Sequence, residues 1–303
     1  MPELPDVAVY VEALQTRVVG HNFIRALIKS PFLLRSAAPP ISDTYGKQVL
    51  EIRRVGKRIG IGVEGNLWLV LHLMIAGRLH WDTKQPKLGS RNALAAFEFD
   101  NGWLWLTEAG TQRRASLTVV EGEAGLQSLS AGGIEPLEVT LDAFRDALRA
   151  ENHTLKRSLT DPHIFSGIGN AYSDEILHRA LLSPVAMSQK LTDDEIARLY
   201  DGTRAVLVEW IDRLRAEAAG GFPEGVTAFR PEMAVHGRYH QPCPRCGAKI
   251  QRIRYASNET NYCAPCQTGG RLLADRALSR LMHQDWPRTL EELEDLKKRR
   301  SQP

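Results

Sequence analysis

The chain has 303 residues, of which 43% are hydrophobic and 25% are charged, and its formal net charge is +3. This length can form two or three modules with their own cores, and the composition is that of an ordinary soluble globular protein. The small net charge excludes a generally basic protein, so any nucleic-acid surface must come from local clusters of cations.

The sequence shows neither an export signal nor a membrane span. The apolar residues near its start are interrupted by Glu12, Gln15 and Arg17. The most apolar run, residues 67–76, contains His72 and is far shorter than the ~20 residues that cross a bilayer. We therefore expect a cytoplasmic protein.

The first residues, Met1-Pro2-Glu3, place an amine beside a carboxylic acid. Removal of Met1 leaves Pro2 with a free secondary amine, and an α-amino group with a pKa near ~8 is partly neutral and nucleophilic at cellular pH. The spacing of apolar residues over 7–18 predicts a helix ended by Gly20, whose positive end disfavours the protonated amine. An amine beside Glu3 suits imine chemistry on a sugar aldehyde carbon, although such a start also occurs by chance.

Residues 23–120 carry the pattern of β-strands. Residues 67–71 are continuously apolar, which predicts a strand buried on both faces. Aromatic residues alternate on both sides of Asp100-Asn101-Gly102, a strong signal for a β-hairpin. We predict a β-sandwich of antiparallel strands with the first helix packed at one edge.

The pattern becomes helical after residues 132–136. Helical spacing over residues 141–148 is continued by residues 155–159, and another helix is predicted for residues 174–181. Thr192-Asp-Asp-Glu195 is a capping box that opens a long helix, which Gly220-Gly221 ends. The next residues, up to Gly237, read as a linker.

Three local features suit phosphate groups, and each has an ordinary alternative. Gly167-Ile-Gly-Asn170 precedes a predicted helix whose N-terminal N–H groups can bind an anion, but taken alone the segment is more often a plain turn between helices. His72 in an apolar strand is more often part of a core. The last feature is a run of four cations near a strand end, where a solvated surface is the usual explanation: Arg53, Arg54, Lys57 and Arg58.

The four cysteines form two C-x2-C pairs, Cys243/Cys246 and Cys263/Cys266, separated by 16 residues. This spacing predicts one tetrahedral structural zinc site on a β-hairpin, with no open position for catalysis. Two disulfides are the alternative, which a chain without an export signal disfavours. The intervening residues carry cations and aromatic rings that suit a phosphate backbone, although a solvated face is equally consistent: Lys249, Arg252, Arg254, Tyr255 and Tyr262.

In this order, the motifs resemble the formamidopyrimidine-DNA glycosylase/endonuclease VIII family of base-excision repair enzymes. The resemblance covers residues 2–267. It rests on Pro2-Glu3-Leu4-Pro5, Lys57, His72-Leu73, Arg113-Arg114, Lys156 through Asp161, Gly167-Ile-Gly-Asn170 with the Tyr-x-Asp-Glu-Ile-Leu177 that follows, and the hairpin ending Tyr262-Cys-x-x-Cys-Gln267.

The resemblance implies an α+β multidomain fold and a bifunctional DNA glycosylase with abasic-site lyase activity. By analogy, Pro2 attacks the deoxyribose C1′ of a flipped-out nucleotide, Glu3 acts as general acid, and Lys57 contacts phosphate and assists β-elimination. The implied partner is double-stranded DNA with a damaged base or abasic site, bound by a bacterial, nucleoid-associated monomer. The implied DNA-contacting residues are His72, Arg113, Arg114, Lys156, Asn170, Arg252, Arg254 and position 258.

The sequence departs from the family pattern at the zinc hairpin. An arginine that grips phosphate and aids δ-elimination is usual five residues before the third cysteine, and this chain has Asn258 there. An amide lacks the charged fork of arginine, so we expect weaker δ-elimination unless Arg252 or Arg254 takes its place.

A second departure concerns the residues that fill the stack after base flipping. Where relatives acting on oxidised purines have methionine, arginine and phenylalanine, this chain has Ile75, Arg113 and Ala115. Because alanine cannot wedge a base step, we expect a lesion range other than ordinary 8-oxoguanine.

The predicted modules are a catalytic β-sandwich (1–136), a helix-two-turn-helix module (137–235), a zinc finger (236–268) and a C-terminal extension (269–303). In the extension, Leu272, Leu273, Leu278 and Leu281 suggest a helix. The charge-segregated end favours a solvated tail, and the alternatives are packing on the zinc hairpin, contact with DNA or partial disorder. Two alternatives to the enzyme remain: a non-catalytic DNA-binding protein of the same fold, and a zinc-ribbon protein that binds structured RNA.

Overall fold

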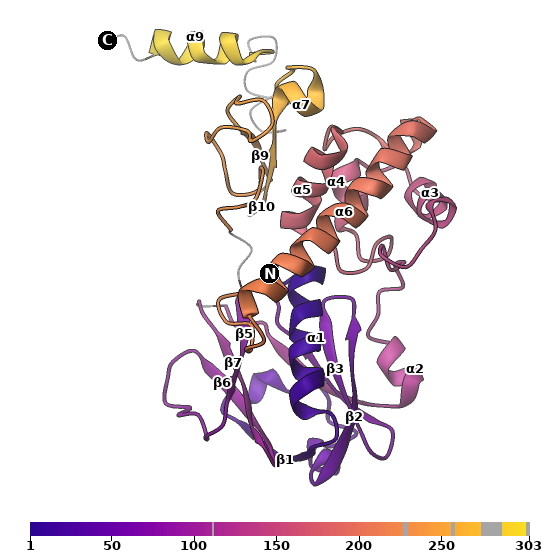
Figure 1. Cartoon of the computed structure of the whole chain (residues 1–303), viewed down its shortest axis with the longest axis vertical. Helices are drawn as coiled ribbons and strands as arrows, with labels where there is room; N and C mark the ends of the chain where they lie inside the picture. Colours follow the sequence, from indigo (N-terminus) through magenta and orange to yellow (C-terminus); the bar gives the residue numbers. More distant parts are fainter. Residues whose placement is uncertain (111, 227–229, 256–257, 274–286, 301–303) are drawn as a thin grey trace. The chain divides into compact units, whose positions relative to one another are not determined.

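The structure is a computed structural model that describes residues 1–110, 112–226, 230–255, 258–273 and 287–300 (Figure 1). The chain splits into two compact units, one of residues 1–133 with 207–228 and one of residues 134–206 with 229–303. The division falls within helix α6 (Asp193–Ala218). Within the described part of the chain, no helix combines the length and apolar character of a membrane span.

The first unit begins with helix α1 (Leu4–Val18), as the apolar spacing predicts. Pro5 lies in the first turn, where a missing N–H costs no helical hydrogen bond. At the same end, the backbone N–H of Glu3 donates to the Asp6 carboxylate at 2.9 Å. Gly20 follows the helix with a φ of 84°, a conformation that glycine adopts without strain. This start fixes the direction in which residues 1–3 leave the helix.

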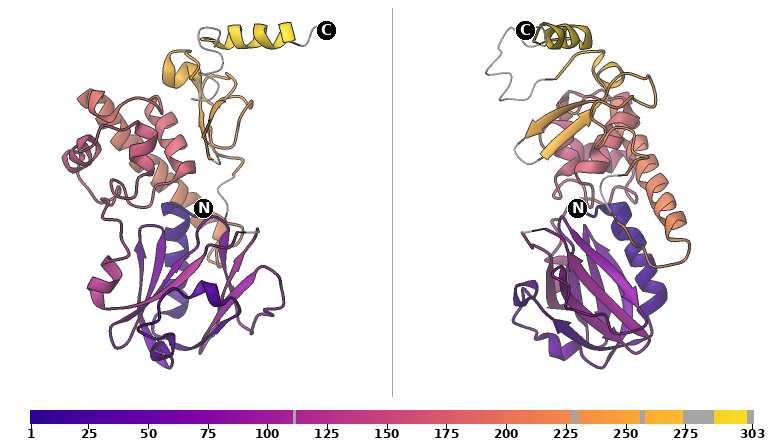
Figure 2. Two further views of the ribbon diagram at one scale, coloured as in Figure 1. Left: turned by 180° about the vertical axis from the view of Figure 1, so that it is seen from behind. Right: turned by 90° about the vertical axis from the view of Figure 1, so that its left-hand side faces the viewer.

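Eight antiparallel strands build the rest of this unit, in the order β5-β7-β6-β1-β2-β3-β4-β8. Only two residue pairs join β1 to β2, so the sheet consists of two four-stranded halves. Both halves and α1 contribute to one apolar core, which confirms the predicted sandwich (Figure 2). The strands are β1 (Asn22–Ile28), β2 (Lys47–Val55), β3 (Arg58–Val63), β4 (Leu67–His72), β5 (Gly77–Asp82), β6 (Ala93–Phe99), β7 (Gly102–Glu108) and β8 (Ser116–Glu121).

Two local predictions for this sheet are confirmed. Strand β4 is buried on both faces, because Leu69 and its alternate neighbours face the main core while Trp68 and Val70 pack on Leu126 of helix α2 (Gly122–Gln127). Strands β6 and β7 form a hairpin in which Phe99 pairs with Gly102. Short 3-10 helices occur at η1 (Pro31–Leu33) and η2 (Ile41–Thr44).

The second unit contains α3 (Leu141–Arg149), α4 (Leu155–Thr160), α5 (Asn170–Ala180), η3 (Ser188–Lys190) and the first part of α6. The two segments with helical spacing, 141–148 and 155–159, are both helical, and they form separate helices because the chain leaves the first after Ala150 and restarts from an extended Thr154. Helix α5 begins at Asn170, four residues earlier than predicted. The capping box of α6 is confirmed, since Thr192 and Glu195 exchange backbone-to-side-chain bonds of 2.9 and 3.2 Å.

The zinc-finger segment forms a two-stranded hairpin, β9 (Gln251–Tyr255) and β10 (Asn258–Tyr262), followed by α7 (Ala264–Thr268). The expected solvated tail is wrong for its described residues, because Leu272 is buried and helix α9 (Leu290–Arg300) packs Leu290 and Leu293 against the hairpin. Lys249 and Glu294 add an ion pair of 2.7 Å. Residues 272 and 273 are not helical, and Leu278 and Leu281 lie outside the described residues.

Candidate functional site

Pro2 and Glu3 are both buried at the start of α1, and Glu3 is only 2% exposed. Burial lowers the pKa of the N-terminal amine of Met1 below its usual value of 8.0. The nearby cations Arg78 and Lys57 lower this pKa further, whereas the carboxylates of Glu3 and Asp6 oppose the shift. The chain start thus lies among both acidic and basic groups, and burial favours a neutral nitrogen.

Lys57 lies in the turn between β2 and β3. Burial lowers the pKa of its ammonium group, and the negative charge of Glu3 partly opposes this shift. Among the described residues, the Lys57 side chain has no hydrogen-bond or ion-pair partner. Its amine is therefore available to an incoming group close to Glu3. By contrast, Arg53 of the same basic run binds Glu51 and Glu123 at 2.8 and 2.6 Å, so that residue has a structural role.

His72 ends strand β4, where it pairs with Arg58 on β3 and Ser116 on β8. Burial, together with the positive charges of Arg58 and Lys57, lowers the pKa of His72 to about 4. The imidazole is therefore neutral at neutral pH. It can donate a hydrogen bond to a phosphate oxygen but cannot contribute a charge.

A tight loop between β4 and β5 presents Ile75, which is 61% exposed. The N–H of Gly77 donates to the carbonyl of Leu73 at 2.9 Å and closes this loop. A Cβ atom at Gly77 would lie 2.3 Å from that carbonyl oxygen, so only glycine fits. Met74 takes a φ of 52°, which is uncommon for a residue with a side chain. The loop therefore exposes the apolar side chain of Ile75 to solvent.

Glu108, at the end of β7, fixes the backbone of the segment that contains Arg113 and Arg114, two predicted DNA contacts. Its carboxylate is 1% exposed and accepts the backbone N–H groups of Arg114 and Ala115 at 3.0 Å. Arg113 donates to the carbonyl of Arg91. Both arginine side chains are exposed, whereas Ala115 belongs to the core. Sequence reasoning missed Glu108, although an acidic residue at the end of an apolar strand is a usable signal.

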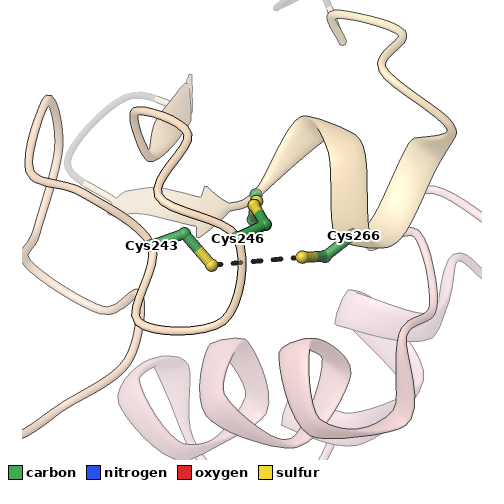
Figure 3. A group of neighbouring side chains, drawn as sticks. Cys243, Cys246 and Cys266 are labelled. Atoms are coloured by element: carbon green, nitrogen blue, oxygen red, sulfur yellow. Dashed lines mark hydrogen bonds between the residues drawn. The ribbon is translucent and has the colours of Figure 1, made fainter.

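The four cysteines converge as predicted. Their sulfur atoms all lie within 4.8 Å of one another, with Cys243 and Cys266 4.0 Å apart and Cys246 and Cys263 3.4 Å apart (Figure 3). These distances exceed an S–S bond of about 2.05 Å, so the disulfide alternative is excluded for this structure. Four convergent thiols fit one tetrahedral structural zinc ion.

The residues around the sulfur atoms support the same site. The Gln267 side chain accepts the N–H of Cys263 at 2.8 Å and donates to the carbonyl of Leu182 at 2.9 Å. Nε2 of the buried His178, on α5, lies 3.3 Å from Cys243 Sγ. Such outer contacts orient metal ligands. The zinc segment is thereby tied to α5 and to the residues that follow it.

Asn170 and Lys156 lie together at the N-terminus of α5. The Asn170 side chain donates to the carbonyl of Glu259 on β10 at 3.0 Å. The Lys156 ammonium group donates to the carbonyl of Asn170 at 2.7 Å. Gly167, in the preceding turn, has a φ of 79° and so needs glycine. The structure therefore brings two predicted DNA-contacting residues to one helix end.

The hairpin carries the other predicted contacts. Arg252 lies over the ring of Tyr239 at 4.1 Å and makes an ion pair of 3.4 Å with Glu259. Arg254 is exposed, and its backbone pairs with that of Glu259. Position 258 pairs with Tyr255, next to the Glu259–Arg254 pair in the same ladder. The negative charge of Glu259 thus lies close to the cations expected to replace the missing arginine.

Comparisons with known proteins identify the family of the chain. Three family models match successive segments: the formamidopyrimidine-DNA glycosylase N-terminal domain (residues 1–114), the formamidopyrimidine-DNA glycosylase H2TH domain (133–217) and the zinc finger found in FPG and IleRS (241–269). The formamidopyrimidine-DNA glycosylase of Heliobacterium modesticaldum is 34% identical over 282 residues, which span 88% of this chain and all of that protein.

Solved structures give the same result. The chain is similar to the MutM (Fpg) protein of Thermus thermophilus, with a TM-score of 0.74 and 29% identity over 88% of this chain and 98% of that one. It is also similar to Lactococcus lactis Fpg in complex with DNA that contains FAPY-dG, with a TM-score of 0.77 and 25% identity over 88% and 100%. The chain belongs to the formamidopyrimidine-DNA glycosylase family.

Proposed function

We propose that this protein is a bifunctional DNA glycosylase and abasic-site lyase of base-excision repair. The observation that carries the proposal is the buried start of α1, where the terminal amine, Glu3 and Lys57 lie within electrostatic reach of one another. Once Met1 is removed, Pro2 becomes the terminal amine in nearly the same environment. Burial and the neighbouring cations then keep this amine neutral and nucleophilic.

The covalent chemistry follows from these groups. The Pro2 nitrogen attacks C1′ as the glycosidic bond breaks, and the bonding electrons leave with the damaged base, which takes up the proton that the Pro2 nitrogen loses. Glu3 protonates the ring oxygen, so the sugar opens to an iminium ion on Pro2. Loss of a C2′ proton then expels the 3′-phosphate in β-elimination, where Lys57 contacts phosphate and assists. Hydrolysis of the iminium ion frees the enzyme.

DNA contacts come from residues on both units. His72, Arg113 and Arg114 of the first unit, and Asn170, Arg252 and Arg254 of the second, can donate to phosphate oxygens. Lactococcus lactis Fpg forms complexes with DNA that contains FAPY-dG or an abasic site, which supports a damaged duplex as the partner. A single lesion in a duplex has no twofold symmetry to match a symmetric dimer, which supports a monomer. The bacterial relatives support a cytoplasmic location on the nucleoid.

One zinc ion held by Cys243, Cys246, Cys263 and Cys266 is structural. It stabilises the hairpin, and every step on the sugar is left to residues of the chain. For the modules we retain the boundaries 1–136, 137–235, 236–268 and 269–303, which follow the order of the three matched segments.

Borohydride trapping tests the proposal. Reduction in the presence of an abasic-site duplex converts the iminium ion into a stable amine, so a covalent complex should form and mass spectrometry should place it on Pro2. A protein with an uncleaved N-terminal tag is the control and should give no complex. A Lys57→Met variant should still be trapped. Absence of any complex from the untagged protein, despite DNA binding, would favour the non-catalytic DNA-binding alternative.

The elimination products test the role of position 258. With asparagine there, the strand nick should carry the unsaturated sugar left by β-elimination. Asn258→Arg restores a charged fork and should increase the share of δ-elimination product. Electrophoresis of end-labelled DNA separates the two products. An unchanged product ratio would mean that a neighbouring cation, such as Arg254, already performs this role.

The lesion range depends on what fills the stack when the damaged base leaves it. Exposed Ile75 is the apolar group available for this, and core residue Ala115 is not. We therefore expect oxidised or ring-opened bases other than 8-oxoguanine to be preferred. A panel of defined duplexes that carry oxidised, ring-opened or alkylated bases measures this directly.

A further inference from the structure

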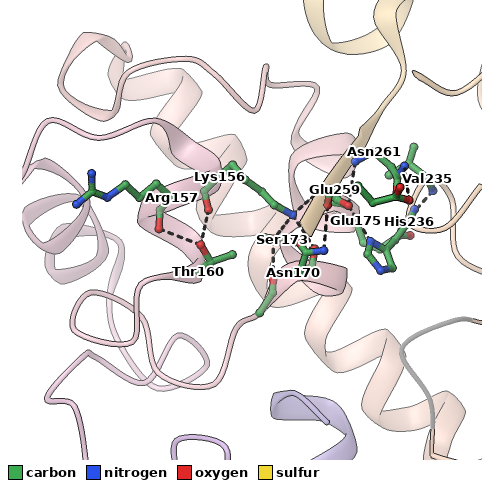
Figure 4. A network of polar contacts seen from close by, with 12 residues as sticks. Lys156, Arg157, Thr160, Asn170, Ser173, Glu175, Val235, His236, Glu259 and Asn261 are labelled. Atoms are coloured by element: carbon green, nitrogen blue, oxygen red, sulfur yellow. Dashed lines mark hydrogen bonds and ion pairs between the residues drawn. The ribbon is translucent and has the colours of Figure 1, made fainter. Parts of the chain in front are cut away.

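Lys156 reaches from α4 to the first turn of α5, and its side chain is only 13% exposed. Its ammonium group donates to the Asn170 carbonyl at 2.7 Å, to Ser173 Oγ at 2.8 Å and to Asp174 Oδ1 at 2.6 Å (Figure 4). An ammonium group has three N–H donors and no acceptor, so these three contacts use all of them. A phosphate oxygen could bind Lys156 only by displacing one of these partners.

Asp174 connects this lysine to the zinc hairpin. Its carboxylate is fully buried, and Oδ2 accepts from His236 Nδ1 at 2.8 Å and from the backbone N–H of Asn261 at 3.1 Å. The carboxylate therefore joins α4, α5, the segment before the hairpin and strand β10. The charge of Lys156 is offset inside the protein.

The adjacent Glu175 strengthens the same junction. Its carboxylate accepts the backbone N–H groups of Ala234, Val235 and His236 at 2.7, 2.9 and 2.9 Å. These bonds fix the segment that leads into the hairpin. Together with Asp174, they hold residues 234–236 and strand β10 against one helix, within a single unit of the chain.

Asn170 is the group that this junction positions. Lys156 holds the Asn170 carbonyl, while the Asn170 amide holds the carbonyl of Glu259, directly beside position 258. We propose that Lys156 is a positioning residue, which sets Asn170 and strand β10 for DNA binding and makes no phosphate contact of its own. The inference rests on the proposed function, since it assumes that Asn170 and the hairpin contact DNA.

Salt dependence separates positioning from phosphate contact. Each phosphate neutralised on duplex DNA contributes a slope of about −0.9 to the plot of log affinity against log salt. A residue that acts through Asn170 leaves this slope unchanged when it is replaced, although the affinity falls. Arg254 is the matched comparison, because it is exposed on the hairpin.

The experiment measures fluorescence anisotropy with a duplex that carries a tetrahydrofuran abasic-site analogue, between about 50 and 200 mM KCl. Lys156→Met should weaken binding by about tenfold, the size typical of coupled contacts, with the slope preserved. Arg254→Gln should make the slope shallower by about 0.9. Replacement of the exposed Lys190 by methionine is the control for simple loss of a lysine and should change neither quantity.

A double-mutant cycle with Asn170→Ala gives the second readout. If Lys156 acts through Asn170, the effect of Lys156→Met largely disappears in the Asn170→Ala background. Additive losses, together with a slope reduced by about 0.9, would overturn the inference and make Lys156 a phosphate contact.

Asp174→Asn covers the case in which Lys156→Met does not fold. Positioning predicts weaker binding for Asp174→Asn, because the junction loses its charge pair. A phosphate contact predicts equal or tighter binding, since the lysine is released toward DNA. Borohydride trapping of the unmodified protein reports on the proposed function separately, so failure of one proposal does not imply failure of the other.

Discussion

Buried ionisable groups differ between the two units in whether they have hydrogen-bond partners. Beside the start of α1, burial lowers the pKa of Lys57 and of His72, and Lys57 has no polar partner among the described residues. At the start of α5, by contrast, Asp174 and Glu175 each accept three hydrogen bonds from protein donors. Desolvation without partners prepares groups for an incoming substrate, whereas desolvation with partners fixes a structure. Burial also raises the pKa of Glu175 in the junction, so the presence or absence of hydrogen-bond partners is what separates a chemical site from a structural junction in this fold.

Removal of zinc has the largest expected effect, and it acts on the structural side of the comparison. Because the binding energy of a structural zinc ion, about 10–16 kcal/mol, is also folding energy, chelation should unfold the hairpin and abolish DNA binding. Hydrogen exchange should show lost protection over residues 241–268 and unchanged protection over α1 and its sheet. Returned zinc should restore the hairpin. Full protection of the hairpin after complete zinc loss would contradict the structural role.

Glu3→Gln tests the chemical side. Removal of the acid should slow base excision by about 10²–10⁴-fold, because a positioned general acid contributes that much to the rate. Affinity for the abasic-site analogue should remain. Glu12→Gln is the matched control on the same helix, because Glu12 binds Arg215 at the surface and should not affect excision. Normal excision by Glu3→Gln would show that the acid lies elsewhere.

Glu175→Gln should have the opposite effect to Glu3→Gln: it should lower the stability of the protein more than the rate of base excision. The substitution weakens three backbone hydrogen bonds to a buried carboxylate, so the free energy of unfolding should fall by about 1–3 kcal/mol. Exposed Glu138→Gln should change it by less than about 0.5 kcal/mol. Urea unfolding measures both. If the two variants are equally stable, the junction does not contribute to stability.

The last expected effect is the pH dependence that His72 adds to stability. The pKa of His72 is about 4 in the folded protein and 6.5 in the reference state, so the unfolded chain binds more protons between these values. Stability should therefore fall as pH drops from about 6.5 to about 4. His72→Gln should make this decline shallower in urea midpoints measured across that range. An unchanged decline would mean that other groups account for it.

Sequence reasoning succeeded where the signal is local. The β6–β7 hairpin follows from turn residues, and the start of α6 follows from the reciprocal bonds of Thr192 and Glu195. The convergence of the four cysteines follows from ligand spacing. Each of these needs only residues close in the chain, or one chemical constraint that brings distant residues together.

The junction at Asp174 was not foreseen, because its partners lie 18, 62 and 87 residues away. Sequence periodicity cannot indicate contacts between residues so far apart, and a charged residue can be recognised as buried only once its partners are known. The same reason applies to the three acceptors of Lys156, a residue for which the family resemblance implied a DNA contact. Glu108 was missed because its partners are backbone N–H groups, which every residue type except proline offers. The break before α4 depends on Thr154, a residue that fits either helix or cap.

The C-terminal extension has a practical consequence for anyone shortening this protein. Leu272, Leu290 and Leu293 cover Ile253 and Tyr262 of the hairpin, and the zinc-finger match ends before them, at residue 269. The family match alone would suggest that the last residues are dispensable. Truncation at that point uncovers apolar side chains on a two-stranded ribbon, which is marginally stable by itself and prone to aggregate. We therefore expect recombinant versions to need α9 for solubility, even though it lies outside the three segments that the family models match.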